Sequence, residues 1–303
     1  MDTNSPRPVR HYVSVCSQAY VAHLLAQQSA LRALEPAGGG CHVLCMDSVI
    51  LGILNKLALP GVRPTLVDDF EDAPLLACKA GRTQAEYCWT AKPRFLLHVL
   101  AQNPDVAEAV YLDADLFPFA DLDPLWAQLA EAEVLLFPHR FPERLMYLEP
   151  IAGRYNAGMV GVRNTSAARE ALAWWAERCL EWCFYQPEDG KLGDQKYLEH
   201  FPERFSGVAD CQDEGIDVAP WNIDRYAPVE RGGAVWLAGR VPLRLYHFHQ
   251  YTLLGGGGYR AVSDPVYTIT PEVRRLIYGP FTAALTSALA LIREVAPEFT
   301  QVS

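Results

Sequence analysis

Val110-Tyr111-Leu112-Asp113-Ala114-Asp115-Leu116-Phe117 is the stretch from which the fold of this chain can be worked out. Its first three residues are apolar strand formers, and two aspartates follow them. If the chain stays extended there, Asp113 and Asp115 point to the same side, because strand side chains alternate. Neighbouring carboxylates repel unless a cation lies between them, and Mg²⁺ or Mn²⁺ prefers such oxygen ligands. The stretch therefore predicts a buried strand that ends at a divalent-metal site, while a strand-end turn with two solvated aspartates is the alternative.

The residues before this strand predict a parallel sheet. The expected elements are strands at 11–16, 41–46 and 62–67, with helices at 19–34 and 48–57. This alternation implies parallel strands joined by right-handed crossovers. No G-x-G-x-x-G follows the first strand, which disfavours a dinucleotide-binding domain. The loop at residues 17–20 is instead expected beside the ligand crevice, at the carboxyl end of its strand.

A further helix is expected over residues 90–100, with Thr90 as its N-cap and Pro93 in its first turn. This prediction leaves Lys92 near a helix N-terminus, where amide donors and the helix dipole favour phosphate. A solvated first-turn lysine is the other interpretation of the same pattern.

The second half of the chain continues the alternation. Strands are expected at 134–137, 155–162 and 243–247, an aromatic helix at 166–185, a glycine loop at 255–258 and a helical tail at 270–295. The 303 residues show no repeat and no linker, which predicts one large domain or two tightly joined halves.

Composition narrows the function classes. The net charge is −10 and no long basic run occurs, which argues against nucleic acid or an anionic membrane as the main partner. The polar N-terminus has no signal-like apolar run, and no window predicts a transmembrane segment. The eight cysteines contain no C-x-x-C pair, so reduced cysteines in a cytoplasmic protein are expected. Peripheral membrane contact and the oligomeric state stay open.

The order of short motifs carries a resemblance. Asp113-x-Asp115 is followed by Tyr155-Asn156-Ala157-Gly158, Asp194-Gln195, Trp221-Asn222 and His247-Phe248. This series resembles the nucleotide-sugar glycosyltransferases of the GT-A fold, most of all family 8, the glycogenin and galactosyltransferase relatives. The resemblance runs from about residue 11 to about residue 258. It implies an α/β, Rossmann-like fold with a mixed, mainly parallel central sheet flanked by helices and a C-terminal helical tail.

The resemblance also implies one catalytic domain over residues 1–303. Its nucleotide-binding half would span about 10–127, its donor-sugar and acceptor half about 128–260, and its tail about 261–303. The implied activity is transfer of a hexose from a UDP-sugar to a sugar or glycolipid acceptor, with Mn²⁺ or Mg²⁺ and with retention of anomeric configuration.

Site residues follow from the matching positions. Asp113, Asp115 and His247 match the metal ligands, and Asp194 and Gln195 match catalytic residues near the anomeric carbon. The residues implied for the donor sugar and nucleotide are Ser17, Tyr20, Asp68, Lys92, Ala114, Asn156, Trp221, Asn222 and His249.

Two departures from the family pattern leave alternatives. His249 and Gln250 follow the late histidine where family 8 has Gly and then Lys-Pro-Trp, so His249 is an alternative metal ligand. The phosphate-contacting lysine has no clear match, and Lys92 and Arg260 are the candidates for its charge.

The mechanism and the function class also stay open at this point. Asp194 fits a helix N-cap, a sugar-orienting group or a nucleophile. An inverting enzyme needs a carboxylate base, for which Glu143, Glu149 and Asp213 are candidates. A nucleotidyltransferase is disfavoured because the first loop is neither glycine-rich nor basic, and a dehalogenase-type phosphatase because its Asp-x-Asp lies near the N-terminus. A non-catalytic sugar-nucleotide or glycan-binding protein remains the alternative from another class.

Overall fold

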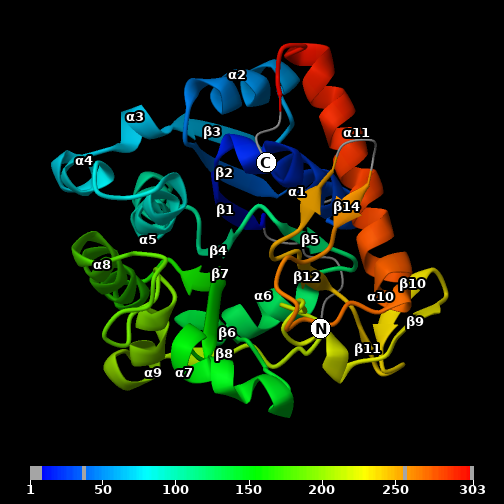
Figure 1. Ribbon diagram of the computed structural model, residues 1–303. Helices are drawn as coiled ribbons and strands as arrows, with labels where there is room; N and C mark the ends of the chain where they lie inside the picture. Colours follow the sequence, from blue (N-terminus) through cyan, green and yellow to red (C-terminus); the bar gives the residue numbers. More distant parts are fainter. Residues whose placement is uncertain (1–8, 36–38, 255–257, 301–303) are drawn as a thin grey trace, which may run out of the picture.

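The computed structural model describes residues 9–35, 39–254 and 258–300 (Figure 1). A seven-stranded sheet in the order β3-β2-β1-β4-β7-β6-β8 forms its centre. β7 runs antiparallel to β4 and β6, whereas the other neighbouring pairs are parallel. The strands are β1 (His11–Cys16), β2 (Gly40–Cys45), β3 (Val62–Leu66), β4 (Glu108–Leu112), β6 (Val134–Pro138), β7 (Tyr155–Arg163) and β8 (Val208–Asp210).

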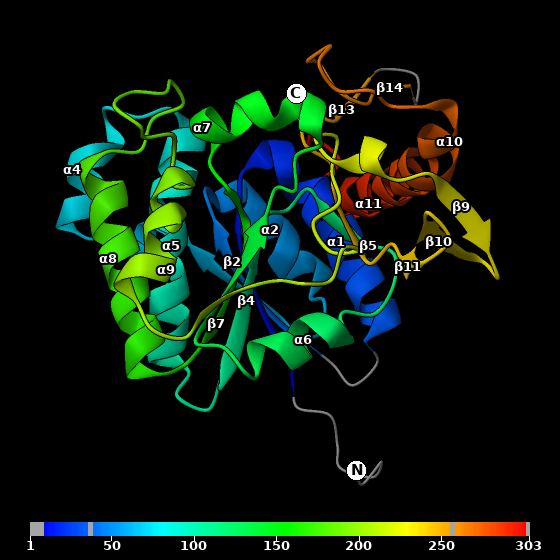
Figure 2. The same cartoon turned by 90° about the horizontal axis from the view of Figure 1, so that it is seen from below.

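Helices cover both faces of this sheet (Figures 1 and 2). One face carries α1 (Val21–Leu34), α2 (Ser48–Leu57) and α11 (Gly279–Val295). The other carries α5 (Gln84–Gln102) and α8 (Ser166–Glu181), which pack against each other. Smaller helices are α3 (Val67–Phe70), α4 (Ala73–Lys79), α6 (Asp123–Leu129), α7 (Glu149–Ala152), α9 (Phe201–Arg204) and α10 (Pro271–Val273).

Three small sheets lie outside the central one. β5 (Leu116–Pro118) pairs antiparallel with β12 (Leu245–His247) and so joins the Asp-x-Asp segment to the late histidine. The others are β9 (Pro228–Arg231), β10 (Ala234–Leu237) and β11 (Val241–Pro242), and the hairpin of β13 (Thr252–Leu253) and β14 (Tyr259–Arg260).

Alternation along the strands builds two cores. In β1, Tyr12 and Cys16 face the core under α1, while Val13 and Val15 face the core under α5. Burial on both faces explains why the central strands are almost continuously apolar. The predicted fold class is therefore confirmed: an α/β, mixed, mainly parallel sheet flanked by helices, with a helical C-terminal segment.

Two sequence predictions need correction, and some short elements were not predicted. The helix predicted at 90–100 begins at Gln84, where Thr83 and Glu86 form a capping box, so Lys92 lies in mid-helix rather than near an N-terminus. The helix predicted to reach residue 185 ends at Glu181. α4 and the β9–β11 sheet were not predicted, because these short elements depend on packing with distant segments. Glycines 255–257 of the predicted loop lie outside the described residues.

The helical tail predicted at 270–295 is confirmed, but its composition differs from the expectation that no window resembles a transmembrane segment. Pro271–Val295, with 25 residues, is long and apolar enough to cross a membrane by length and composition alone. Its residues Phe281, Leu285 and Ile292 are buried, and α11 packs against α1. A buried core helix passes the same composition test.

Candidate active site

A turn between β4 and β5 holds the two aspartates. β4 ends at Leu112, and the Asp113 N–H donates to the Gly158 carbonyl at 2.8 Å. The Gln27 side chain donates to the carbonyl oxygens of Asp113 (2.8 Å) and Leu116 (2.9 Å) from α1, which fixes both ends of the turn. Ala114 is buried within it. The carboxylates thus converge because of this turn and not because the chain stays extended, as the sequence had suggested.

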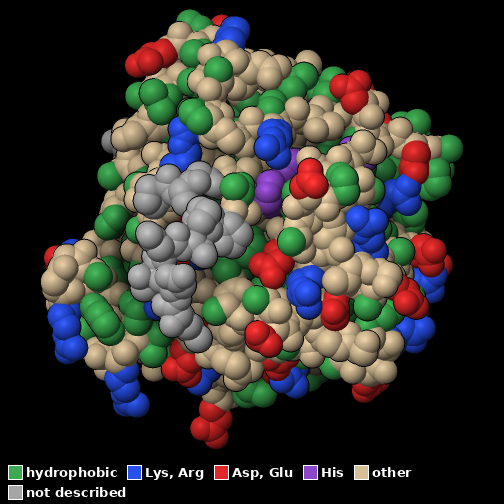
Figure 3. Space-filling model, turned by 180° about the vertical axis from the view of Figure 1, so that it is seen from behind, with side chains coloured by type: hydrophobic (Ala, Val, Ile, Leu, Met, Phe, Trp, Pro, Cys, Tyr) green, Lys and Arg blue, Asp and Glu red, His purple; other side chains and the backbone are tan. Residues whose placement is uncertain are grey.

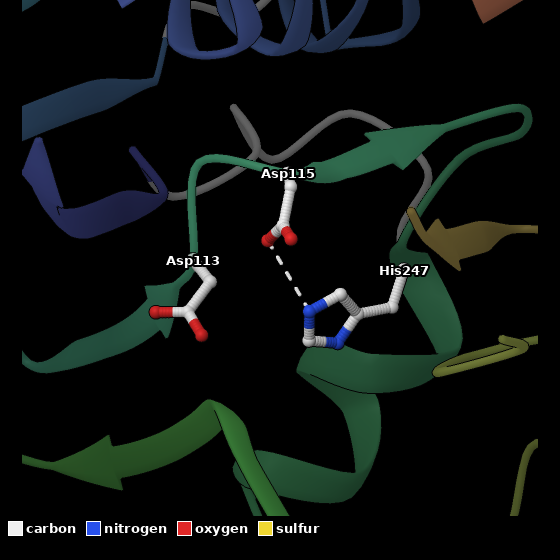
Figure 4. Close-up of side chains that lie close together, drawn as sticks. All are labelled: Asp113, Asp115 and His247. Carbon is white, nitrogen blue, oxygen red and sulfur yellow. Dashed lines mark ion pairs between the residues drawn. The ribbon is translucent and has the colours of Figure 1, made fainter. Parts of the chain in front are cut away.

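Asp113, Asp115 and His247 form a cluster that can hold a metal ion (Figure 4). One ligand atom from each lies within 4.8 Å of the others, and Asp115 Oδ1 lies 3.2 Å from His247 Nε2. An octahedral ion with ligands at about 2.1 Å needs adjacent ligands about 3 Å apart. The Asp115–His247 spacing therefore suits a divalent ion, and so does the mixed set of carboxylate and imidazole donors.

The cluster is electrostatically paired. Burial alone raises the pKa of Asp115, but the adjacent His247 outweighs it and lowers that pKa to about 2. For His247, burial lowers the pKa, but Asp115 and, behind it, Asp217 raise it to about 10. Without a metal, the pair is an imidazolium next to a carboxylate.

His249 stays outside this cluster. Its ring centre lies 6.2 Å from that of His247 and 5.6 Å from Trp221, and burial lowers its pKa to about 4. Within the described part of the chain, His247 and not His249 joins the two aspartates. The Trp221 ring lies 5.2 Å from the His247 ring, so Trp221 lies beside the cluster.

Lys92 is a buried counter-ion within α5. Its Nζ lies 2.8 Å from Asp194 Oδ2 and 3.5 Å from Asp113 Oδ1, and it donates to the Ala157 carbonyl at 2.9 Å. Tyr111 donates its hydroxyl to Asp113 Oδ1 at 2.8 Å. Burial raises the pKa of Asp194, an effect that Lys92 opposes. Lys92 thus links the catalytic candidate Asp194 to the metal cluster. It does so from the middle of α5 and not from a helix N-terminus, as the sequence had predicted.

Asn156 lies behind His247. Its Nδ2 is 2.9 Å from His247 Nδ1 and donates to Asp217 Oδ1 at 2.8 Å, while its Oδ1 accepts from the Gly158 N–H at 3.0 Å. A Cβ on Gly158 would lie 2.6 Å from His247 Cε1, so only glycine fits there. Asn156 was predicted to contact the donor sugar, but both polar atoms of its side chain are engaged with other protein groups.

Gln195 and Asn222 are likewise held by the backbone. Gln195 accepts from the Ala157 N–H at 3.2 Å and donates to the Ala152 carbonyl at 2.7 Å. Asn222 donates to the carbonyls of His139 (2.8 Å) and Asp217 (3.1 Å). Gln195 thereby fixes the loop that carries Asp194, and Asn222 fixes the loop that carries Trp221.

The predicted nucleotide side is more open. Tyr20 is 42% exposed, and the charge of Asp115, followed by burial and by the charge of Asp113, raises its pKa. Ser17 is buried at the end of β1. Asp68 is exposed on α3, beyond the edge strand β3.

Two residues of the site were not predicted from the sequence. Asp217 is fully buried behind His247, and Gln27 holds the turn between the aspartates. Neither lies in a recognisable pattern, since each acts through a residue at least 30 positions away.

Comparison with other sequences gives the family. No family model matches the chain. The uncharacterized proteins YfnF and YfnD of Bacillus subtilis (strain 168) are 33% and 32% identical to it over 294 residues. These residues are 95% of this chain, 95% of YfnF and 93% of YfnD. The chain belongs to the YfnF and YfnD family.

Solved structures share the fold of this YfnF and YfnD relative. The galactosyltransferase LgtC, in complex with donor and acceptor sugar analogues, matches with a TM-score of 0.55 and 16% identity, over 91% of this chain and 95% of LgtC. GlyE, a glycosyltransferase of Streptococcus pneumoniae TIGR4, matches with a TM-score of 0.53 and 14% identity, over 95% of this chain and 64% of GlyE. The chain thus has the GT-A fold, and the predicted resemblance to family 8 glycosyltransferases is confirmed at the level of the fold.

Proposed function

We propose that this protein is a metal-dependent glycosyltransferase that moves a hexose from a UDP-sugar to a sugar or glycolipid acceptor. The observation that supports this most is the cluster of Asp113, Asp115 and His247 at the carboxyl end of β4, in a GT-A fold. Ligands of open α/β sheets bind at this edge of the sheet. LgtC, which shares the fold, was crystallised with donor and acceptor sugar analogues.

The proposed roles follow from the contacts. Asp113, Asp115 and His247 would hold Mn²⁺ or Mg²⁺, which when bound supplies positive charge to the diphosphate leaving group. Lys92 opposes the burial that raises the pKa of Asp194, and its Nζ also lies 3.5 Å from Asp113 Oδ1. Asp194, held by Lys92 at 2.8 Å, is proposed to orient the donor sugar.

The remaining predicted residues are proposed to line the donor pocket. Ala114 lies between the two aspartates in the chain, Tyr20 lies in the turn that follows β1, and Trp221 and His249 lie on the His247 side. Ser17 and Asp68 are proposed for the nucleotide end, and Asn156, Gln195 and Asn222 for holding the walls of the pocket.

An aromatic rim beside the metal cluster suits a sugar acceptor. Tyr267 lies with its ring centre 6.3 Å from His249, and Tyr147 and Tyr185 are 58% and 65% exposed. Both of these tyrosines act electrostatically on Tyr267, whose pKa burial raises to about 12. Exposed aromatic rings of this kind offer an apolar face to a sugar ring.

Retention is the stereochemical outcome we propose. An inverting enzyme needs a free carboxylate base near the acceptor. Of the candidates, Asp213 is engaged by Arg244 Nε at 2.9 Å and by the Gly215 N–H. Glu143 and Glu149, on the segment that carries Tyr147, are the bases left for an inverting mechanism.

Calorimetric titration with UDP, GDP and CDP, each with and without Mn²⁺, tests this function. We expect Mn²⁺-dependent UDP binding that Asp115→Asn abolishes and Asp121→Asn leaves intact, since Asp121 is 46% exposed and pairs with Arg244. Binding of no nucleotide under any condition would refute the proposal. Slow UDP release from a UDP-sugar would distinguish an enzyme from a binding protein, and NMR of the released sugar's anomer would distinguish retention from inversion.

We further propose that the chain acts as one catalytic domain in the cytoplasm. Its eight cysteines are unpaired, and six of them are buried, as expected in a reducing compartment. On the face shown in Figure 3, Lys and Arg side chains are scattered among acidic ones rather than gathered in one patch. This distribution fits a sugar nucleotide rather than a nucleic acid as the partner.

A further inference from the structure

Asp217 occupies an unfavourable position. Its side chain is fully buried, its Oδ2 has no hydrogen-bond partner, and its backbone is left-handed with φ +62°. A buried carboxylate is costly unless a cation or several donors compensate it, and a left-handed backbone is unfavourable for a residue with a Cβ. Strain and desolvation at one residue are found more often at functional sites than elsewhere.

The only cationic partner that the described residues give Asp217 is His247, whose Nδ1 lies 3.8 Å from Asp217 Oδ1. The other ring nitrogen, Nε2, faces Asp115 and the metal cluster. A histidine that binds a metal through Nε2 must carry its remaining proton on Nδ1. The metal-binding form of His247 therefore needs a hydrogen-bond acceptor at Nδ1.

Asn156 cannot be that acceptor. Its Nδ2 is the atom 2.9 Å from His247 Nδ1, and an amide nitrogen has no lone pair to accept a proton. Two contacts fix the amide in this orientation, because Oδ1 accepts from the Gly158 N–H and Nδ2 donates to Asp217 Oδ1. Among the described residues, Asp217 Oδ1 is the carboxylate oxygen that faces Nδ1, at 3.8 Å. To accept the Nδ1 proton it must come about 1 Å closer, and the Asn156 amide, which donates to Nδ1 in the arrangement seen here, must give way to it.

The backbone holds the carboxylate and the imidazole side by side. His247 N–H donates to the Val218 carbonyl at 2.7 Å, and Val218 N–H donates to the Leu245 carbonyl at 3.1 Å. Asn222 donates to the carbonyl of Asp217 itself at 3.1 Å. Asp217 is thus tied to the strand that carries His247.

We propose that Asp217 is the positioning residue that keeps His247 in its metal-binding tautomer, with the proton on Nδ1 and Nε2 free for a divalent cation. This inference rests on the proposed metal site and adds a residue that the Asp-x-Asp and histidine motifs do not contain. An acceptor of this kind orients the ring and raises the basicity of the ligating nitrogen.

The test is the Mn²⁺ dissociation constant, measured by electron paramagnetic resonance of free Mn²⁺. We expect Asp217→Asn, which keeps a neutral acceptor, to raise it by about 10- to 100-fold. Asp217→Gly removes the acceptor and suits φ +62°, so its loss of affinity should be larger. Asp213→Asn is the matched control, because Asp213 lies on the same segment but pairs with Arg244.

Stability separates a positioning role from a merely structural one. Asp217→Asn keeps a side-chain oxygen that can accept from Asn156 Nδ2, so this variant should stay folded, as circular dichroism would report, while its Mn²⁺ affinity falls. Affinities for both variants within about twofold of the parent would overturn the proposal and leave the metal site intact. A parent protein that binds no Mn²⁺ would overturn the metal site and the proposal together.

A measurement on the unaltered chain covers the case in which the variants fail to fold. With ¹⁵N-labelled histidine and bound Mg²⁺, the ring signals missing from His247→Gln belong to His247. We expect its Nδ1 to carry the proton. A proton on Nε2, with Mg²⁺ bound, would overturn the proposal.

Discussion

Lys92→Met should destabilise the fold strongly. The Lys92 side chain is 2% exposed and lies between Asp194 and Asp113, so the variant leaves Asp194 buried without its cation. Removing one partner of a buried ion pair costs about 3–5 kcal/mol. At an unfolding entropy of about 2.1 cal/mol/K per residue, the 303 residues give about 0.64 kcal/mol/K. The thermal midpoint should therefore fall by about 5–8 °C.

The assay is thermal unfolding of the metal-free protein by calorimetry, with two comparison variants. Lys79→Met breaks a more exposed ion pair with Glu71, in which Lys79 is 43% exposed, and should cost at most about 1 kcal/mol. Asp194→Asn combined with Lys92→Met removes the stranded charge and should recover most of the loss. A Lys92→Met midpoint within about 1 °C of the parent would refute the view that Lys92 balances buried carboxylates.

Three further predictions concern the metal cluster. Gly158→Ala should weaken Mn²⁺ binding, because its Cβ would displace His247, whereas Gly52→Ala, with open space around it, should not. Because the pKa of His247 is raised to about 10, its pairing stabilises the metal-free fold fully below pH about 6.5 and less as pH rises through 10. At pH 7.5, Mn²⁺ binding should thus release close to one proton, measured by calorimetry in buffers of different ionisation enthalpy. Asp115→Asn should abolish Mn²⁺ binding with the fold kept, as circular dichroism would report; intact binding would exclude Asp115 as a ligand.

The central sheet and the metal cluster follow from local sequence signals. Apolar runs at residues 11–16 and 110–112 are long enough to define strands, and a carboxylate pair after the second run falls at the ligand edge of the sheet. The match of His247 to a family motif then predicted the third member of the cluster. Each of these signals lies within a short stretch of sequence, so it can be recognised without knowledge of any tertiary contact.

The surroundings of the cluster do not follow from the sequence, because they depend on contacts between distant segments. Asn156 meets His247 across 91 positions, and Lys92 meets the Ala157 carbonyl across 65. The helix start at Gln84 was missed because the Thr83 and Glu86 capping box lies ahead of the apolar stripe that indicated the helix. Lys92 was consequently assigned to phosphate, although its charge is used by two carboxylates.

The charge of the finished site favours a divalent cation. Asp113, Asp115, Asp194 and Asp217 converge there, and the described residues within ion-pair distance supply only Lys92 and the imidazolium of His247. Two negative charges remain without a partner. If a divalent ion replaces the His247 proton, one negative charge remains without a partner. The bound ion also places positive charge at the edge of the sheet where a diphosphate would lie. The excess of carboxylates therefore favours metal over proton, and it favours an anionic ligand only once the metal is bound.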